Sequence, residues 1–287
     1  NSLDSYLFLL LPLFFYTLFF IVPNAMALVN SFYKWDGISP VKKFVGFKNF
    51  RNMFNDRIFW ISFWNTLKYC ITLLVFQTSI GLGLALLLQK SDKISSLFRT
   101  TYFLPVMMSS VTVGLIWSFI YDPNIGALNE FLRAIGLHDW AHSWLSDDQI
   151  VIYAIAFVHI WVGIGQSVVL FVAGMQNIPV ELYESASMDG ATKFQQTLHV
   201  TLPLLKPTIL IVTVLTTIGG FKSFDYVYIM TGGGATHSSE VLSTLLYKEA
   251  YAYSDFGYSS ALSVALLLIV AVLTFLQMRV FSDKDGE

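Results

Sequence analysis

The sequence predicts an all-α integral membrane protein with six transmembrane helices. Of its 287 residues, 55% are hydrophobic and only 13% are charged, whereas a typical soluble domain is about a quarter charged. Long apolar runs recur along the chain, and about 20 consecutive apolar residues are enough for a helix to span a bilayer. One polar stretch, residues 177–206, separates the fourth of these runs from the fifth.

The first apolar run lies within residues 5–33, which contain no charged side chain. The tripeptide Ala25-Met26-Ala27 mimics a signal-peptidase site, but the apolar run before it is longer than a usual signal core. We therefore expect a retained span. Because the chain begins with Asn1 and not with Met, we also expect that a native N-terminal segment is missing.

The segment 34–58 is polar and holds six Lys or Arg residues. Within it, Phe47, Phe50, Met53 and Phe54 recur at helical spacing. This pattern favours an amphipathic helix at the membrane interface. A helix packed on the aqueous side of the protein is an open alternative.

The remaining spans are predicted in the same way, from apolar runs that lie between polar segments. Lys90 begins a short basic connection, and Pro105 predicts a kink in the third span. Trp and Tyr residues stand at the edges of the polar loop 122–149, as expected near a membrane interface. A flexible outer loop is expected over 231–255. The six spans are thus predicted at about 5–33, 60–89, 100–121, 150–176, 207–230 and 256–278.

The polar stretch between the fourth and fifth runs is expected to form two short helices. Pro179 suits the first turn of a helix, which does not need the missing N–H. Gly190 can adopt the left-handed conformation that ends a helix. A second helix is expected over 191–202, after which Pro203 and Pro207 would bend the chain into the next span.

The spacing within this stretch resembles the Glu-Ala-Ala…Gly…Ile-x-Leu-Pro loop of ABC importer permeases. Ser185 replaces the first Ala and Val200 replaces Ile, and both substitutions keep small or β-branched side chains. The resemblance implies a cytoplasmic coupling helix between spans 4 and 5 that inserts into a cleft on a separate ATPase subunit. The expected coupling residues are Glu184, Ser185, Ala186, Asp189, Gly190, Val200, Leu202 and Pro203.

Further motifs look like the maltose-type permeases of carbohydrate importers, with Ala235 in place of the usual Pro. They are GFKNF at 46–50, Asn65-Thr66-Leu67, Leu104-Pro105, Asp225-Tyr226, the Thr-Gly-Gly-Gly run at 231–234 and Gly-Tyr-Ser-Ser-Ala at 257–261. The resemblance covers most of the chain. It implies one transmembrane domain over 1–287 that imports a sugar or oligosaccharide by alternating access across a bacterial cytoplasmic membrane.

The same resemblance implies the partners and the orientation. The expected partners are a second homologous permease subunit, two ABC ATPases and an extracellular or periplasmic solute-binding protein. ATP and Mg²⁺ would bind to the ATPases, and this chain would bind no cofactor. Both termini would be cytoplasmic. The positive-inside rule does not support this orientation, because the six basic residues of 34–58 oppose the cytoplasmic set Lys90, Lys93, Arg99, Lys193, Lys206, Arg279 and Lys284.

Several chemistries lack a motif in this sequence. The chain has no Walker-type phosphate loop and no Gly-Lys dipeptide, so we expect a transport subunit and not an enzyme. No His/Glu cluster has metal-ligand spacing, and the lone Cys70 cannot form a disulfide within the chain. The net charge of −2 gives no reason to expect nucleic acid.

The position of polar residues in the maltose-type pattern implies the substrate pathway. Polar groups at bilayer depth commonly mark such pathways. The implied residues are Ser110, Gly163, Gln166, Gly220, Lys222, Ser223 and Asp225. Gln166 replaces an aromatic residue and Gly220 an amide, so the same sugar is not implied.

Structural readings of the same residues remain open. The two serines are equally consistent with helix packing or with bonding back to the preceding turn. Lys222 and Asp225 lie three residues apart and would pair on one helix, whereas a pathway-facing Lys222 would receive an acidic or phosphorylated sugar. For His159, a packing role is favoured over a proton relay.

Two other functions compete with the permease interpretation. In an ion-coupled secondary transporter, Asp225, Lys222 and His159 would form the relay, but the coupling loop would have no role. An intramembrane enzyme has no nucleophile motif to support it. An ABC permease for an acidic or phosphorylated sugar remains a variant of the leading interpretation.

Overall fold

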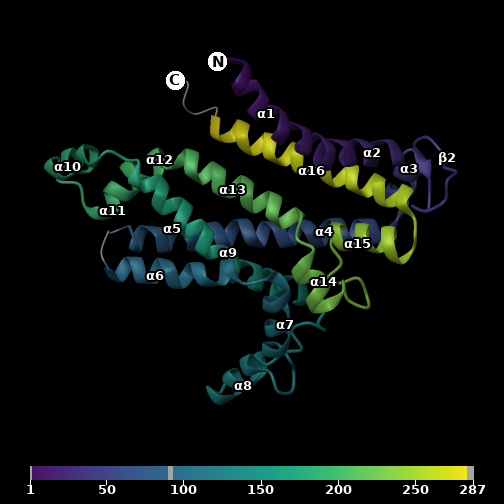
Figure 1. Cartoon of the computed structure of the whole chain (residues 1–287). Helices are drawn as coiled ribbons and strands as arrows, with labels where there is room; N and C mark the ends of the chain where they lie inside the picture. Colours follow the sequence, from purple (N-terminus) through teal and green to yellow (C-terminus); the bar gives the residue numbers. More distant parts are fainter. Residues whose placement is uncertain (1, 90–92, 283–287) are drawn as a thin grey trace. The chain divides into compact units, whose positions relative to one another are not determined.

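The computed structural model describes residues 2–89 and 93–282, which are almost entirely helical (Figure 1). Lys90 and Lys284, two of the basic residues counted above, lie outside the described residues. Contacts divide the chain into two units. One comprises Asn1–Trp60 and Leu242–Ile269, and the other comprises Ile61–Val241 and Val270–Glu287. Each unit is described separately.

The first unit contains the N-terminal helical run and the start of the last helix. Its elements are α1 (Ser2–Tyr16), a π-helical turn (Thr17–Ile21), α2 (Val22–Asn30), β1 (Tyr33–Lys34), β2 (Lys43–Phe44), α3 (Lys48–Asn55), α15 (Leu242–Tyr247) and a second π-helical turn (Lys248–Ala252). Helix α4 (Arg57–Thr72) begins here, as does α16 (Phe256–Ser282). The loop expected over 231–255 is therefore largely helical in its second half, which corrects the prediction of a flexible loop.

Side-chain bonds anchor the short ribbon of β1 and β2 inside this unit. The Asn49 amide on α3 donates to the carbonyls of Ser31 (2.8 Å) and Tyr33 (2.9 Å). The Tyr258 hydroxyl on α16 donates to Asp56 (2.8 Å). Helix α3 is thus fixed by its buried amide as well as by its apolar side chains.

The second unit holds the remaining helices. Its further elements are a π-helical turn (Leu73–Gln77), α5 (Thr78–Leu87), α6 (Lys93–Phe103), a 3₁₀ turn (Leu104–Met107), α7 (Ser110–Ile120), α8 (Ala127–Ala134), a 3₁₀ turn (His138–Trp140), α9 (Val151–Gln176), α10 (Val180–Met188), α11 (Lys193–Gln196), a π-helical turn (Thr197–Thr201), α12 (Leu202–Leu204), α13 (Lys206–Phe221) and α14 (Asp225–Thr231).

Helix α9 forms the centre of this unit. Residues such as Ile155, Ala156 and Phe171 on it are fully buried, and more than half of its apolar window lies inside the structure. Figure 1 shows α9 crossing α5, and α9 contacts α5, α6 and α13. A helix that is apolar on all sides is expected to be buried. The uniformly apolar sequence of α9 is therefore consistent with its central position.

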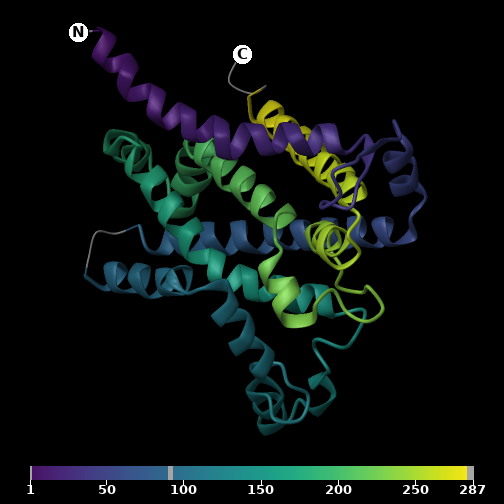
Figure 2. The same ribbon diagram turned by 45° about the vertical axis from the view of Figure 1, so that its right-hand side comes forward.

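The third predicted span is not one helix with a mild kink. Helices α6 and α7 meet at a bend of 97°, which both views show (Figures 1 and 2). The break lies at Met108 and Ser109, where the backbone becomes extended. Pro105 itself sits within a 3₁₀ turn. Pro105 thus predicted the position of the bend to within a few residues, but it did not predict that the helix breaks there.

Five described helices are long and apolar enough to cross a membrane, and the count rises to six if the bent pair is one span. Five of the predicted spans, all but the third, match candidate spans closely. The fifth, Lys206–Thr231, is interrupted, because α13 ends at Phe221 and α14 starts again at Asp225. Lys222 and Asp225 therefore do not lie on one helix.

Candidate functional site

The polar stretch 177–206 forms a helix–turn–helix, as the sequence predicts. Helix α10 starts directly after Pro179. Gly190 has a φ of +81°, a left-handed value that side chains with a Cβ rarely adopt. The second helical segment runs from Lys193 through α12 and is capped by Thr192, whose hydroxyl accepts from the Gln195 N–H. The Gln195 side chain accepts from the Thr192 N–H (2.8 Å), which completes a capping box.

Side-chain bonds hold the two helical segments together. The buried Gln196 amide donates to the Ser187 hydroxyl (2.8 Å). The Tyr183 and Thr201 hydroxyls share a hydrogen bond of 3.0 Å. Both bonds link α10 to the segment after Gly190, so the loop is a fixed unit. No sequence pattern predicted these two hydrogen bonds. The Thr-x-x-Gln spacing, by contrast, is a recognisable pattern for the cap at Thr192.

The solvent-exposed surface of the helix–turn–helix carries both carboxylates and apolar side chains. Glu184 and Asp189 are exposed, and neither forms an ion pair within the described part of the chain. Met188 and Phe194, one on each side of the Gly190 turn, are 89% and 75% exposed. Exposed apolar side chains ringed by polar groups are typical of protein interaction sites.

The other predicted coupling residues lie on both segments. Ser185 and Ala186 are on α10, and the Ser185 hydroxyl donates to the Leu182 carbonyl (3.2 Å). Val200 is in the π-helical turn, and Leu202 and Pro203 begin the short helix α12. The helix continues past Pro203, since the Leu205 N–H still donates to the Thr201 carbonyl (2.9 Å).

Among the predicted pathway residues, Gly163 and Gln166 line one cavity of about 150 Å³ in the second unit. Gly163 permits close approach of a side chain, because a Cβ there would lie 2.7 Å from three atoms of the Gln77 amide. His159 and Thr216 line the same cavity. The wall of this cavity therefore combines amide, imidazole and hydroxyl groups, which all belong to candidate membrane spans.

Gln77 was missed by the sequence analysis. Its amide donates to the Ser167 hydroxyl (3.2 Å), while its Oε1 atom is buried and has no partner in the described structure. It ends a π-helical turn, a feature frequent at functional sites. The readable signal was that Gln77 is the only amide side chain between residues 69 and 88.

Ser223 belongs to a second polar group. Its hydroxyl bonds the Tyr69 hydroxyl (3.0 Å), which in turn bonds Nδ1 of His159 (2.9 Å). The serine thus bonds across helices and not only to its own turn. His159 is a bonded packing residue that also borders the cavity. Gly220 packs against Cys70, where a Cβ would meet the cysteine at 3.3 Å.

Ser110 and Asp225 pair with each other at two helix starts. The Ser110 hydroxyl on α7 donates to the Asp225 carboxylate on α14 (2.7 Å). The interpretation that Lys222 and Asp225 pair is wrong for this structure. The helix break between them removes the i, i+3 geometry, and no ion pair joins them.

Residues 77–282 match the family model described as "Binding-protein-dependent transport system inner membrane component". This match covers more than half of the chain. The chain belongs to this family. The predicted membership in the ABC importer permeases is therefore confirmed, and this permease is a membrane component of a binding-protein-dependent transport system.

Relatives cover nearly the whole permease. It is 39% identical to the probable ABC transporter permease protein YurN of Bacillus subtilis, over 100% of this chain and 99% of that protein. It is 34% identical to the diacetylchitobiose uptake system permease protein NgcF of Streptomyces coelicolor, over 98% and 83%. It is 30% identical to the multiple sugar-binding transport system permease protein MsmF of Streptococcus mutans, over 97% and 95%.

A solved structure shares the fold. A chain of a bacterial ABC transporter involved in the import of the acidic polysaccharide alginate superposes with a TM-score of 0.85 at 24% identity. The match covers 99% of this permease and 98% of that chain. The permease thus shares its fold with a chain of a known ABC transporter.

Proposed function

We propose that this permease imports a sugar or oligosaccharide across the bacterial cytoplasmic membrane by alternating access. The observation that carries the proposal is the family membership combined with the sugars named for its relatives. Those relatives include uptake systems for diacetylchitobiose, multiple sugars and arabinooligosaccharides. The polar cavity bordered by Gln77, His159 and Gln166 supplies the amide and imidazole groups that bind sugar hydroxyls.

The energy would come from partner subunits. The helix–turn–helix at 180–204, with Glu184 exposed and apolar side chains around Gly190, suits a cleft on an ABC ATPase. ATP and Mg²⁺ would bind there and not on this chain. A second homologous permease, two ATPases and a solute-binding protein complete the proposed assembly, in which the loop and both termini face the cytoplasm. In this proposal 1–287 is one domain with six spans, the bent pair counting as one.

A pull-down from native membranes tests this assembly. The solubilised full chain is isolated with its partners, which are identified by mass spectrometry. A second permease, a Walker-motif ATPase and a solute-binding protein are expected. The binding protein is then screened against sugars. A chain that purifies alone and transports without ATP would overturn the proposal and favour the ion-coupled transporter.

Replacing Lys222 by Met tests whether the substrate is anionic. Lys222 is exposed within a candidate span, and no carboxylate pairs with it in the described structure. A lysine at the centre of a span costs about 2.5–3.5 kcal/mol on insertion scales, and a Lys222 that faces the pathway would offset this cost by binding an anionic substrate. We expect lower uptake of an acidic or phosphorylated sugar and unchanged uptake of a neutral one.

Lys68→Met is the matched control for this experiment. Lys68 is also an exposed lysine inside a candidate span without an ion pair among the described residues. Uptake of both kinds of sugar should be unchanged in this variant. If Lys222→Met leaves uptake of an identified anionic substrate intact, Lys222 has only a structural role.

A further inference from the structure

The ribbon of β1 and β2 places two lysines directly opposite each other. In its register Lys34 pairs with Lys43, and Tyr33 pairs with Phe44. Directly opposite residues share one face of a ribbon, and like charges in such positions are destabilising. No carboxylate in residues 2–89 and 93–282 lies within ion-pair distance of either ammonium group. The pair therefore lacks a counter-ion within the described chain.

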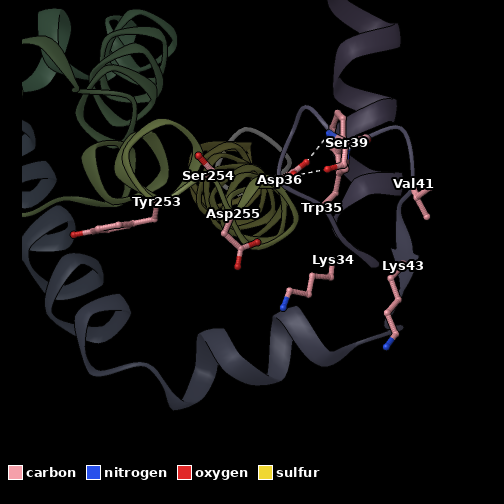
Figure 3. Close-up of a pocket in the computed structure, with 9 residues that line it drawn as sticks. All are labelled: Lys34, Trp35, Asp36, Ser39, Val41, Lys43, Tyr253, Ser254 and Asp255. Carbon is pink, nitrogen blue, oxygen red and sulfur yellow. Dashed lines mark hydrogen bonds between the residues drawn. The ribbon is translucent and has the colours of Figure 1, made fainter.

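Both lysines line an open pocket of about 390 Å³ within the first unit (Figure 3). The two carboxylates of the pocket, Asp36 and Asp255, bond to groups of their own segments and not to the lysines. Asp36 accepts from the Ser39 hydroxyl (2.5 Å) and from the N–H groups of Ser39 and Ile38, which together hold its pKa at about 2. Asp255 accepts from the Tyr258 N–H (3.0 Å).

The neighbouring Lys42 differs from this pair. Its ammonium lies 3.8 Å from the centre of the Trp35 ring and donates to Asn30 (2.8 Å). A cation over an aromatic face is stabilised by the ring. Lys34 and Lys43 have no such contact among the described residues, so the unpaired positive charge of the ribbon resides on them.

The pocket lies where two candidate spans end. The first span ends at Asn30, four residues before Lys34, and the last begins at Phe256, directly after Asp255. Span ends lie at the depth of lipid headgroups. Lysine side chains near such ends reach headgroup phosphates.

Exposed apolar side chains accompany the lysines. Ile38 and Val41, in the loop of the ribbon, are 88% and 79% exposed. A soluble anion bound between the lysines would leave this apolar surface in water. A lipid covers it with acyl chains while its phosphate meets the ammonium groups.

We propose that this ribbon binds an anionic phospholipid, with the headgroup phosphate between Lys34 and Lys43 and the acyl chains against Ile38 and Val41. In the orientation proposed above, the site gives two of the six basic residues of 34–58 a ligand on the side that the positive-inside rule disfavours. It does not depend on the transported substrate.

Replacing both lysines, as Lys34→Gln with Lys43→Gln in the full chain, tests the site. Purified protein is placed in nanodiscs of phosphatidylcholine with increasing phosphatidylglycerol, and bound lipid is counted by native mass spectrometry. We expect phosphatidylglycerol binding about thirtyfold weaker than in the unaltered chain, since each surface lysine contributes roughly a factor of five to binding of anionic lipid. Equal binding by both proteins would overturn the proposal.

The double variant Lys48→Gln with Arg51→Gln is the matched control. It removes the same charge from α3, outside the pocket lining, and should keep its phosphatidylglycerol binding. An equal loss in both double variants would show a general charge effect and overturn the site. Release of phosphatidylglycerol by excess alginate, or by an acidic solute-binding protein, would overturn it in favour of that ligand.

Lys34→Glu separates lipid binding from the stability of the ribbon. Glu at this position would pair with Lys43 across the strands, so the variant should lose its preference for phosphatidylglycerol yet melt no lower than the unaltered chain in pure phosphatidylcholine. A lower melting temperature of this variant in pure phosphatidylcholine would show that Lys34 stabilises the fold, and it would contradict the proposal.

Discussion

Uptake is expected to fall to background when Gly190 is replaced by proline, with the permease still inserted in the membrane. Gly190 has a φ of +81°, and the proline ring locks φ near −65°. The turn between α10 and the segment after it would then open, and the bonds that join Gln196 to Ser187 would be lost. Uptake by whole cells and the amount of protein in the membrane fraction are the measurements.

Gly136→Pro is the matched control for this experiment. Gly136 has a φ of +83°, and as at Gly190 no atom lies within 4 Å of a Cβ built there. It follows α8, far along the chain from the coupling loop. Uptake should largely persist in this variant. Equal loss in both would show that any strained turn stops transport, and it would remove the special role of the loop.

Charge reversal at Glu184 tests the same loop without altering its backbone. Glu184→Lys should leave the helix–turn–helix folded, because Glu184 forms no ion pair within the described residues. The ATPase should no longer co-purify, and uptake should fall with it. Normal co-purification together with normal uptake would refute the assignment of Glu184 to the ATPase contact.

Thermal stability should fall on replacing Gly165 by alanine. A Cβ at Gly165 would collide with the Tyr102 carbonyl oxygen and would lie 2.9 Å from the Phe103 Cα. Both obstacles are backbone atoms of α6, which cannot rotate away. Overpacking of this kind costs about 1–3 kcal/mol, which lowers the melting temperature of a domain of this size by roughly 3–10 °C. Scanning fluorimetry on the purified chain measures it.

Gly83→Ala on α5 provides the comparison. No atom lies within 4 Å of a Cβ built there, and alanine is the better helix former by about 0.8–1 kcal/mol. Its melting temperature should be unchanged or slightly higher. If Gly165→Ala melts like Gly83→Ala, α6 and α9 are not in the close contact described above.

The helix–turn–helix at 180–204 was the most predictable part of the candidate site. Pro179 and Gly190 act through their own backbone restrictions, so their effects do not depend on distant contacts. The tie between Tyr183 and Thr201 was not predictable, because it joins residues 18 apart in sequence. Likewise, Gln77 approaches Gly163 from another helix, and only the packing of α9 against its neighbours brings them together.

The sequence alone determined that this is a helical membrane protein, where most of its spans lie and where the helix–turn–helix at 180–204 turns. These features follow from hydropathy and from local backbone preferences, which act over a few residues. Three features became clear only from the tertiary structure. They are the helix break after Phe221, the hydrogen bond of Asp225 to Ser110, and the pairing of Lys34 with Lys43 across the ribbon. Each of these depends on which helix or strand faces which, and that is set by packing between residues far apart in the chain.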